Sequence, residues 1–182
     1  MPRWLNLPNS FTLLRLILAP FVVREILAGR HFFALELFAV AAVTDVLDGA
    51  AARRFGSTSR AGAYLDPIAD KVLMSGVFLA LAIAGIVPWW LVIVIFARDL
   101  YILLGAGLFL AFTSVRNLPP TVWGKLSTFV QIVTAVIWMG RNALDLGILH
   151  TLAPLTVWPC AAATIWSGLD YTWRGIQLAR AR

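Results

Sequence analysis

Four aspartates are the residues of this sequence best suited to chemistry. Asp45 and Asp48 stand three positions apart, and Asp66 and Asp70 stand four positions apart. Both spacings put the paired side chains on one face of a helix, which turns by about 100° per residue. A charged residue inside an apolar membrane segment costs about 2.5–3.5 kcal/mol on insertion scales. A sequence that keeps four such acids therefore indicates a function for them.

Small and basic residues share the faces of these acids: Gly49, Ala52, Arg53 and Gly62. Four negative charges in a low-dielectric environment repel one another unless a cation lies among them. All-oxygen ligation suits Mg²⁺, Mn²⁺ or Ca²⁺, and a surplus of carboxylates could hold two ions. We therefore predict a divalent metal site on Asp45, Asp48, Asp66 and Asp70, with small residues that permit close helix packing or leave room for a ligand.

Two other interpretations of the acids stay open. They could form ion pairs at a helical hairpin near the membrane surface, with Arg53, Arg54, Arg60 and Lys71 as partners. Metal-ion transporters also place carboxylates inside a helix bundle, but near the bilayer midplane and in broken helices of a repeated unit. Here the acids cluster toward one surface, and no internal repeat is visible.

The composition indicates an integral membrane protein. Of the 182 residues, 60% are hydrophobic and 13% are charged, and the mean hydropathy is +0.84. A soluble domain of this size would expose large apolar patches. One cysteine and two histidines exclude an intramolecular disulfide and a Cys/His zinc site. No basic run exceeds two residues, so nucleic acid is not expected as a partner despite the net charge of +6.

Six apolar segments are long enough to cross a bilayer as helices, which takes about 20 residues. They comprise residues 10–28, 32–52, 63–85, 88–112, 122–139 and 150–171. None shows the period-two pattern of a membrane strand. We expect an all-α, multi-pass bundle of six transmembrane helices, forming a single domain over residues 1–182.

Lysines and arginines are unequally divided between the two ends of these segments. Nine lie on the side of the termini, three lie on the other side, and three fall within the segments. Cytoplasmic loops carry the excess of Lys and Arg. Both termini and the aspartate pairs are therefore expected on the cytoplasmic side, in a bacterial-type inner membrane.

The aspartates belong to a longer pattern of fixed spacing. It resembles the signature of the CDP-alcohol phosphatidyltransferases at each of its eight fixed positions, and reads Asp45-x-x-Asp48-Gly49-x-x-Ala52-Arg53, eight residues, Gly62-x-x-x-Asp66-x-x-x-Asp70. An N-terminal segment, Asn9-x-x-Thr12-x-x-Arg15, and the six predicted spans also look like members that make phosphatidylglycerophosphate or cardiolipin.

The resemblance implies transfer of a phosphatidyl group from CDP-diacylglycerol to an alcohol, with release of CMP. It implies that the four aspartates hold two Mg²⁺ or Mn²⁺ ions, that Asp70 is also the general base, and that the protein is a homodimer among membrane lipids. The residues that would bind the CDP moiety are Asp45, Gly49, Ala52, Arg53 and Gly62.

The acceptor is expected to meet basic residues outside the signature: Arg98, Arg116 and Lys125. Arg98 and Asp99 could instead form a structural ion pair, and Lys125 could be an interfacial lysine. Residues 97–99 resemble a segment of the glycerol-phosphate-using branch, but the further arginine of that branch is absent from residues 101–112. The pattern is closer to eukaryotic-type cardiolipin synthases. We therefore predict phosphatidylglycerol as acceptor, with glycerol 3-phosphate as the alternative.

Overall fold

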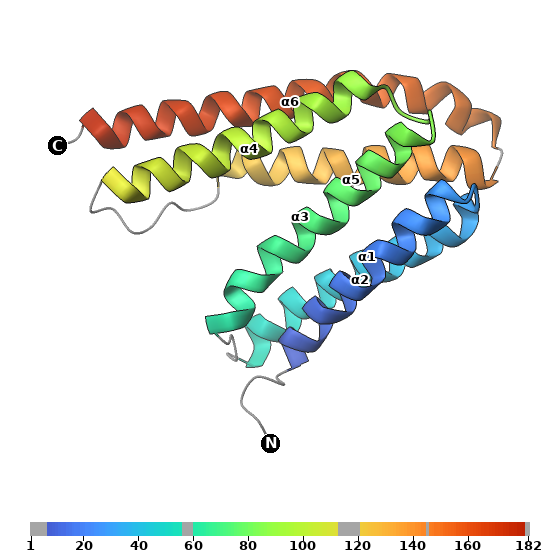
Figure 1. Cartoon of the computed structure of the whole chain (residues 1–182), viewed down its shortest axis with the longest axis horizontal. Helices are drawn as coiled ribbons and strands as arrows, with labels where there is room; N and C mark the ends of the chain where they lie inside the picture. The colour runs from blue at the N-terminus through green and yellow to red at the C-terminus, as the bar shows by residue number, and fades with distance from the viewer. Residues whose placement is uncertain (1–6, 56–59, 113–120, 145, 181–182) are drawn as a thin grey trace. The chain divides into compact units, whose positions relative to one another are not determined.

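The computed structural model of the chain is all-helical over the residues it describes (Figure 1). It describes the backbone of residues 7–55, 60–112, 121–144 and 146–180, and the side chains of residues 12–44, 68–105, 121–144 and 146–177. The helices are α1 (Leu7–Leu27), α2 (His31–Phe55), α3 (Arg60–Ile83), α4 (Trp89–Phe112), α5 (Val122–Leu144) and α6 (Gly147–Arg180). The predicted all-α class is confirmed, while six membrane crossings stay a prediction.

Each predicted span corresponds to one helix, but the helix ends differ from the span ends. The largest difference is at α6, which has 34 residues and continues well past the predicted end at residue 171. Polar residues such as Arg141 and Arg174 remain helical, because backbone hydrogen bonds within a helix do not require apolar side chains. Hydropathy therefore locates the apolar part of each helix and misses its polar ends.

The described chain divides into two compact units. The first comprises Met1–Val87 and Met139–Asp145, and the second comprises Pro88–Trp138 and Leu146–Arg182. In the first unit α1 packs against both α2 and α3, and in the second α4 packs against α6 (Figure 1). The single domain expected over residues 1–182 stays a prediction.

The core of the first unit is formed by apolar side chains at helical spacing. On α1, Val22 and Ile26 are fully buried, and α3 contributes Val77 and Leu81, also fully buried. Helices α1 and α3 pack tightly at a glycine: a Cβ added to Gly76 would lie 3.0 Å from Cγ2 of Val23. The absence of a side chain at position 76 thus permits this packing distance.

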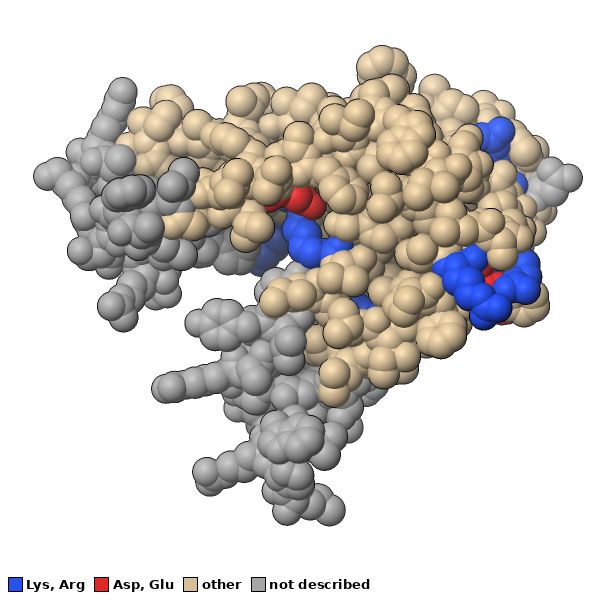
Figure 2. All heavy atoms as spheres, in the orientation of Figure 1, with Lys and Arg blue, Asp and Glu red and all other residues tan. Residues whose placement is uncertain are grey.

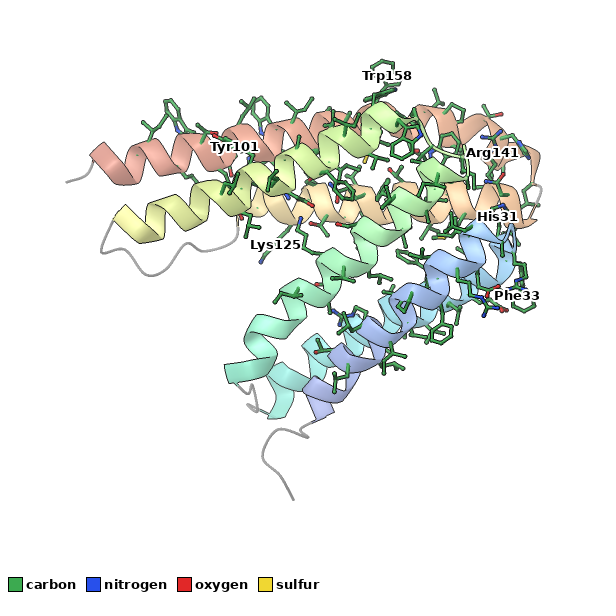
Figure 3. The ribbon with its side chains drawn as sticks, viewed as in Figure 1. His31, Phe33, Tyr101, Lys125, Arg141 and Trp158 are labelled. Atoms are coloured by element: carbon green, nitrogen blue, oxygen red, sulfur yellow. The ribbon has the colours of Figure 1, made fainter. Side chains whose placement is uncertain are left out.

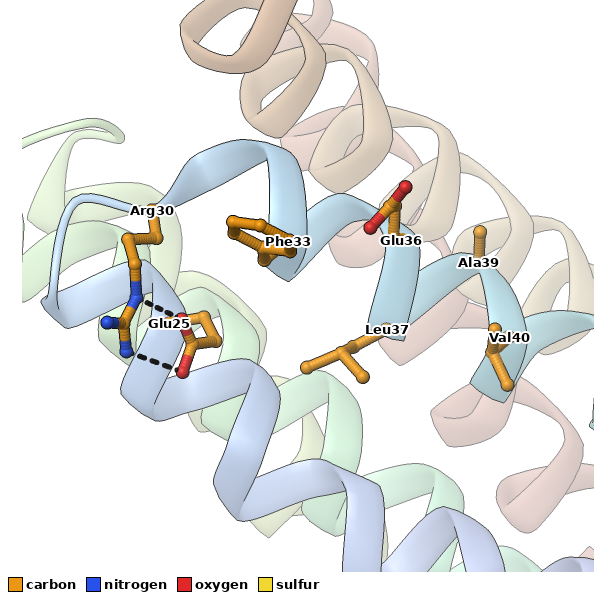
Figure 4. A pocket seen from close by; sticks show the side chains of 7 residues that line it. All are labelled: Glu25, Arg30, Phe33, Glu36, Leu37, Ala39 and Val40. Carbon is orange, nitrogen blue, oxygen red and sulfur yellow. Dashed lines mark hydrogen bonds and ion pairs between the residues drawn. The ribbon is translucent and has the colours of Figure 1, made fainter.

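Two turns of the first unit depend on glycines in the left-handed backbone region. Gly29 (φ +72°) follows α1, and Gly85 (φ +70°) follows α3. After Gly29, the Arg30 amide donates to the Glu25 carbonyl at 2.9 Å. The Arg30 guanidinium also binds the Glu25 carboxylate, with Nη2 2.8 Å from Oε1 (Figure 4). A side chain at either glycine would strain a turn that reverses the chain.

In the second unit, buried polar side chains join α5 to α6. Gln131 Nε2 donates to Thr164 Oγ1 at 3.1 Å and to Ser127 Oγ at 3.4 Å. The Thr164 hydroxyl in turn donates to the Cys160 carbonyl at 2.7 Å. These side chains satisfy one another's hydrogen-bonding groups between two apolar helices, where water is scarce.

The outward surface of both units is largely apolar. Leu103 is 70% exposed and Trp158 is 71% exposed, and among the described residues Figure 2 shows charged side chains in only a few small groups on the face drawn. Within the described part of the chain, two helices are long and apolar enough to cross a membrane: Val122–Leu144 and Gly147–Gln177. Only 28% of the apolar stretch in Gly147–Gln177 is buried. Apolar surface of this extent indicates membrane association.

Candidate active site

The aspartate motif falls on two helices, as its spacing predicts. Residues 45–53 lie within α2 and residues 62–70 lie within α3. Asp70 is the motif residue whose side chain the structure describes. The remaining motif side chains lie outside the described residues: Asp45, Asp48, Gly49, Ala52, Arg53, Gly62 and Asp66. The geometry of the predicted metal and CDP sites therefore stays a prediction.

Asp70 is held by an arginine from another helix. Nη1 of Arg15, on α1, donates to Oδ1 of Asp70 and forms an ion pair with it. The Arg15 side chain is 1% exposed, whereas that of Asp70 is 46% exposed. The guanidinium thus fixes the carboxylate from the buried side and leaves the carboxylate accessible from the other side.

Arg15 had no predicted role in the site, although it belongs to the N-terminal segment that resembles the family. The two partners are separated by 55 positions, so no local spacing relates them. The available signal was the charge itself, because an arginine inside an apolar span requires a polar partner. Of the ion pairs proposed for the hairpin, none involved Arg15.

Arg98 is the centre of a polar cluster in the second unit. Its Nη1 donates to Oδ1 of Asp99 at 2.8 Å, and its Nη2 donates to the hydroxyl of Ser167 on α6. Its Cζ lies 6.0 Å from the centroid of the Tyr171 ring. The structural ion pair between Arg98 and Asp99 that the sequence allowed is therefore present. The Asp99 carboxylate offsets part of the charge that Arg98 could offer an anionic ligand.

The guanidinium of Arg98 has one further hydrogen-bond donor, the Nε–H group. Its side chain is 10% exposed, and its Nε is buried without a hydrogen-bond partner among the described residues. Buried donors are normally satisfied, so this N–H is suited to a ligand oxygen or a bound water. Sequence reasoning missed Ser167 and Tyr171, since both lie on a helix far along the chain from Arg98.

Helix α5 brings a second predicted acceptor residue to this cluster. A Cβ on Gly124 would lie 3.4 Å from Cε2 of Tyr171 and 3.6 Å from Nη2 of Arg98. Lys125 follows directly, with an exposed side chain (Figure 3). The structure thus brings Arg98 near the Gly124-Lys125 segment, whereas Arg116 lies outside the described residues.

The donor chemistry of the motif suits a hard divalent ion. Four carboxylates supply the oxygen ligands that Mg²⁺ and Mn²⁺ take. Among the side chains that the structure describes, no group of three His, Cys, Asp or Glu is placed to hold a metal ion. Three of the four predicted metal ligands lie outside the described side chains: Asp45, Asp48 and Asp66.

Known proteins match this chain along most of its length. The family model described as CDP-alcohol phosphatidyltransferase matches residues 5–166. A Mycobacterium tuberculosis protein named probable phosphatidylglycerophosphate synthase is 36% identical, covering 96% of this chain and 84% of that protein. The Drosophila melanogaster probable cardiolipin synthase (CMP-forming) is 33% identical, covering 88% and 56%. The Bacillus subtilis CDP-diacylglycerol--glycerol-3-phosphate 3-phosphatidyltransferase is 32% identical, covering 91% and 93%.

The matched segment contains the whole aspartate motif together with Arg15, Arg98 and Lys125. The names of these relatives describe two kinds of synthase, for phosphatidylglycerophosphate and for cardiolipin, so the names leave the acceptor of this chain open. With nearly the whole chain inside the family model and relatives above 30% identity, this protein belongs to the CDP-alcohol phosphatidyltransferase family and is an enzyme of phospholipid biosynthesis.

Proposed function

We propose that this phosphatidyltransferase uses CDP-diacylglycerol to convert phosphatidylglycerol to cardiolipin, with release of CMP. The observation that carries the choice of acceptor is the environment of Arg98. Arg98 is the single basic residue of α4, and its guanidinium is already engaged by Asp99 and Ser167.

The charge of the acceptor explains why this environment favours a lipid. Glycerol 3-phosphate is a small dianion captured from water, and its binding demands several converging cations. Phosphatidylglycerol carries one charge on a phosphodiester, and its acyl chains remain in the bilayer. A partly neutralised Arg98, with Lys125 and Arg116 as the other predicted acceptor-binding residues, meets the smaller demand.

The proposed chemistry places the four aspartates around two Mg²⁺ or Mn²⁺ ions, which would neutralise the diphosphate of CDP-diacylglycerol. Asp45 and the small residues of the motif, with Arg53, bind the CDP moiety: Gly49, Ala52 and Gly62. Asp70 accepts the proton of the acceptor hydroxyl as that oxygen attacks phosphorus. The ion pair with Arg15 supports this role, because a base must be held in place.

We place the enzyme in the membrane as six spanning helices with cytoplasmic termini, a cytoplasmic active site and a homodimeric assembly. The distribution of Lys and Arg supports this orientation. The outward apolar surface of the described helices supports a lipid environment. The family assignment replaces the metal-ion transporter that the acids alone left open.

Glycerol 3-phosphate remains a second candidate acceptor because relatives from M. tuberculosis and B. subtilis carry names that imply it. The two are separated by giving the purified enzyme CDP-diacylglycerol, Mg²⁺ and either phosphatidylglycerol or radiolabelled glycerol 3-phosphate. We expect cardiolipin from phosphatidylglycerol, formed at least about 10²-fold more slowly by the Asp70→Asn variant. Label in a chloroform-soluble product, with no product from phosphatidylglycerol, would reverse the choice of acceptor.

A further inference from the structure

A pocket of about 490 Å³ lies within the first unit, where the turns after α1 and α3 meet the last turn of α5. Gly29, Gly85, His31, Arg141 and Asn142 are among its lining residues. Figure 3 shows His31 and Arg141 at the same end of this unit. His31 begins α2 fourteen residues before Asp45, which is about 21 Å along a helix at 1.5 Å per residue. The pocket is therefore separate from the aspartate motif.

The polar groups of this pocket are hydrogen-bond donors suited to an anion. Arg141 supplies a permanent positive charge, and Asn142 supplies an amide. His31 Nδ1 is buried without a hydrogen-bond partner among the described residues. Burial lowers the pKa of His31, which precedes the predicted membrane span, so the ring is neutral at pH 7 and still carries one N–H. Among the described lining residues there is no Asp or Glu.

Three backbone amides in the turns that line the pocket already donate hydrogen bonds to carbonyl groups. The Gly29 amide donates to the Ile26 carbonyl at 3.0 Å, and the Gly85 amide donates to the Ala82 carbonyl at 3.0 Å. The Ile86 amide donates to the Leu81 carbonyl at 2.8 Å. Because these three amides are already used, we assign the binding of a ligand to the polar side chains of the pocket.

We propose that this pocket binds a phosphate group through the Arg141 guanidinium, with the His31 ring and the Asn142 amide as further donors. A planar guanidinium fork matches two phosphate oxygens. A volume of this size is typical of sites for small molecules, so it accommodates more than the phosphate alone. The phosphate comes either from a phospholipid headgroup or from free inorganic phosphate, because both present the same oxygens.

The two histidines of the chain allow a local measurement. The full-length enzyme is labelled with ¹³C at the histidine Cε1 and studied by NMR in detergent micelles at pH 7. Sodium phosphate, dioleoyl phosphatidylglycerol and dioleoylglycerol, which lacks phosphate, are titrated separately. We expect a saturable shift of the His31 signal with a phosphate-bearing probe and no shift with dioleoylglycerol. The signal of His150, on α6 of the second unit, is recorded in the same spectra for comparison.

Substitutions of two arginines at the same end of the first unit distinguish binding at a specific site from a general effect of positive charge. Arg141→Gln is expected to weaken the phosphate-dependent shift about tenfold or more, since it removes the charged donor. Arg24→Gln removes the same charge from an exposed residue that does not line the pocket, and it is expected to change the affinity less than twofold. Should Arg141→Gln fail to fold, Arg141→Lys keeps the charge without the fork and is expected to show intermediate affinity.

Each outcome decides the proposal. A response to phosphatidylglycerol alone identifies a headgroup site, and a response to inorganic phosphate alone identifies a free-anion site. No saturable His31 shift, an equal shift with dioleoylglycerol, or equal losses in the two arginine variants would overturn it. None of these readouts depends on phosphatidyl transfer, so the result is independent of the proposed acceptor.

Discussion

At the scale of single residues, the proposed role of Asp70 as general base sets two requirements that oppose each other. A general base must be held in one position, yet it must also be reached by the hydroxyl whose proton it takes. The buried Arg15 provides the first, and the exposure of nearly half of the Asp70 side chain (46%) provides the second. The ion pair therefore belongs to the proposed site and not only to the packing of α1 against α3.

Replacing Asp70 with asparagine keeps the side-chain shape and removes the proton acceptor. We expect turnover, measured as CMP release, to fall by about 10²-fold or more, the usual scale of general-base catalysis. Binding of CDP-diacylglycerol should fall less. Near-normal turnover in Asp70→Asn would assign the proton transfer to another residue or to water.

Arg15 is predicted to act as a positioning residue through Asp70. Arg15→Gln removes the charge that holds the carboxylate, so kcat should fall at least about tenfold, in line with the loss of one charge-assisted hydrogen bond. Arg15→Lys should restore part of the activity, because it keeps the charge. Arg24→Gln on the same helix is the matched control. If the glutamine and lysine variants were equally inactive but folded, a positioning role through charge would be wrong.

At the scale of helices, the contact between α1 and α3 depends on a missing side chain. Gly76→Leu would put Cβ 3.0 Å from Val23 Cγ2, with the rest of the side chain still to be placed. We expect a loss of about 1–3 kcal/mol in the free energy of unfolding, as is usual for an overpacked core. Gly105→Leu on α4, where a Cβ meets nothing within 4 Å, is the control. The measurement is denaturant unfolding in micelles, and equal stability of the two variants would contradict the close approach.

The contact between α5 and α6 depends instead on buried polar groups. Gln131→Leu removes both donors to Thr164 and Ser127, whose hydroxyls are buried. The expected loss in unfolding free energy is about 0.6–1.7 kcal/mol, from the average to the maximum measured for hydrogen bonds between membrane helices. Thr128→Val, on an exposed face of the same helix, provides the comparison. A stabilised Gln131→Leu variant would show that apolar packing alone serves this interface.

At the scale of the whole molecule, the four aspartates require compensation that the described residues supply only in part. Arg15 pairs with Asp70, and bound divalent ions are the proposed compensation for the others. Activity should therefore vanish when the enzyme is treated with excess chelator and return on addition of Mg²⁺ or Mn²⁺. Full turnover in excess chelator would exclude the proposed metal site, while leaving the family assignment intact.

Local spacing and composition were sufficient to predict several features of this protein. The intervals between Asp45, Asp48, Asp66 and Asp70 define a motif whatever the packing, since the helical period alone places paired residues on one face. Apolar segments of sufficient length likewise predict helices without knowledge of their neighbours. The all-α class and the family followed from these features.

The partners of individual side chains were decided only by the tertiary structure. Arg15 meets Asp70 across 55 positions, and Arg98 meets Ser167 across 69. The pocket at Arg141 is assembled from turns and helix ends far apart in the chain. Helices that are apolar on most faces offer no pattern that specifies which face meets which neighbour. That choice depends on the packing of shapes, such as Gly76 against Val23, and on the pairing of buried polar groups.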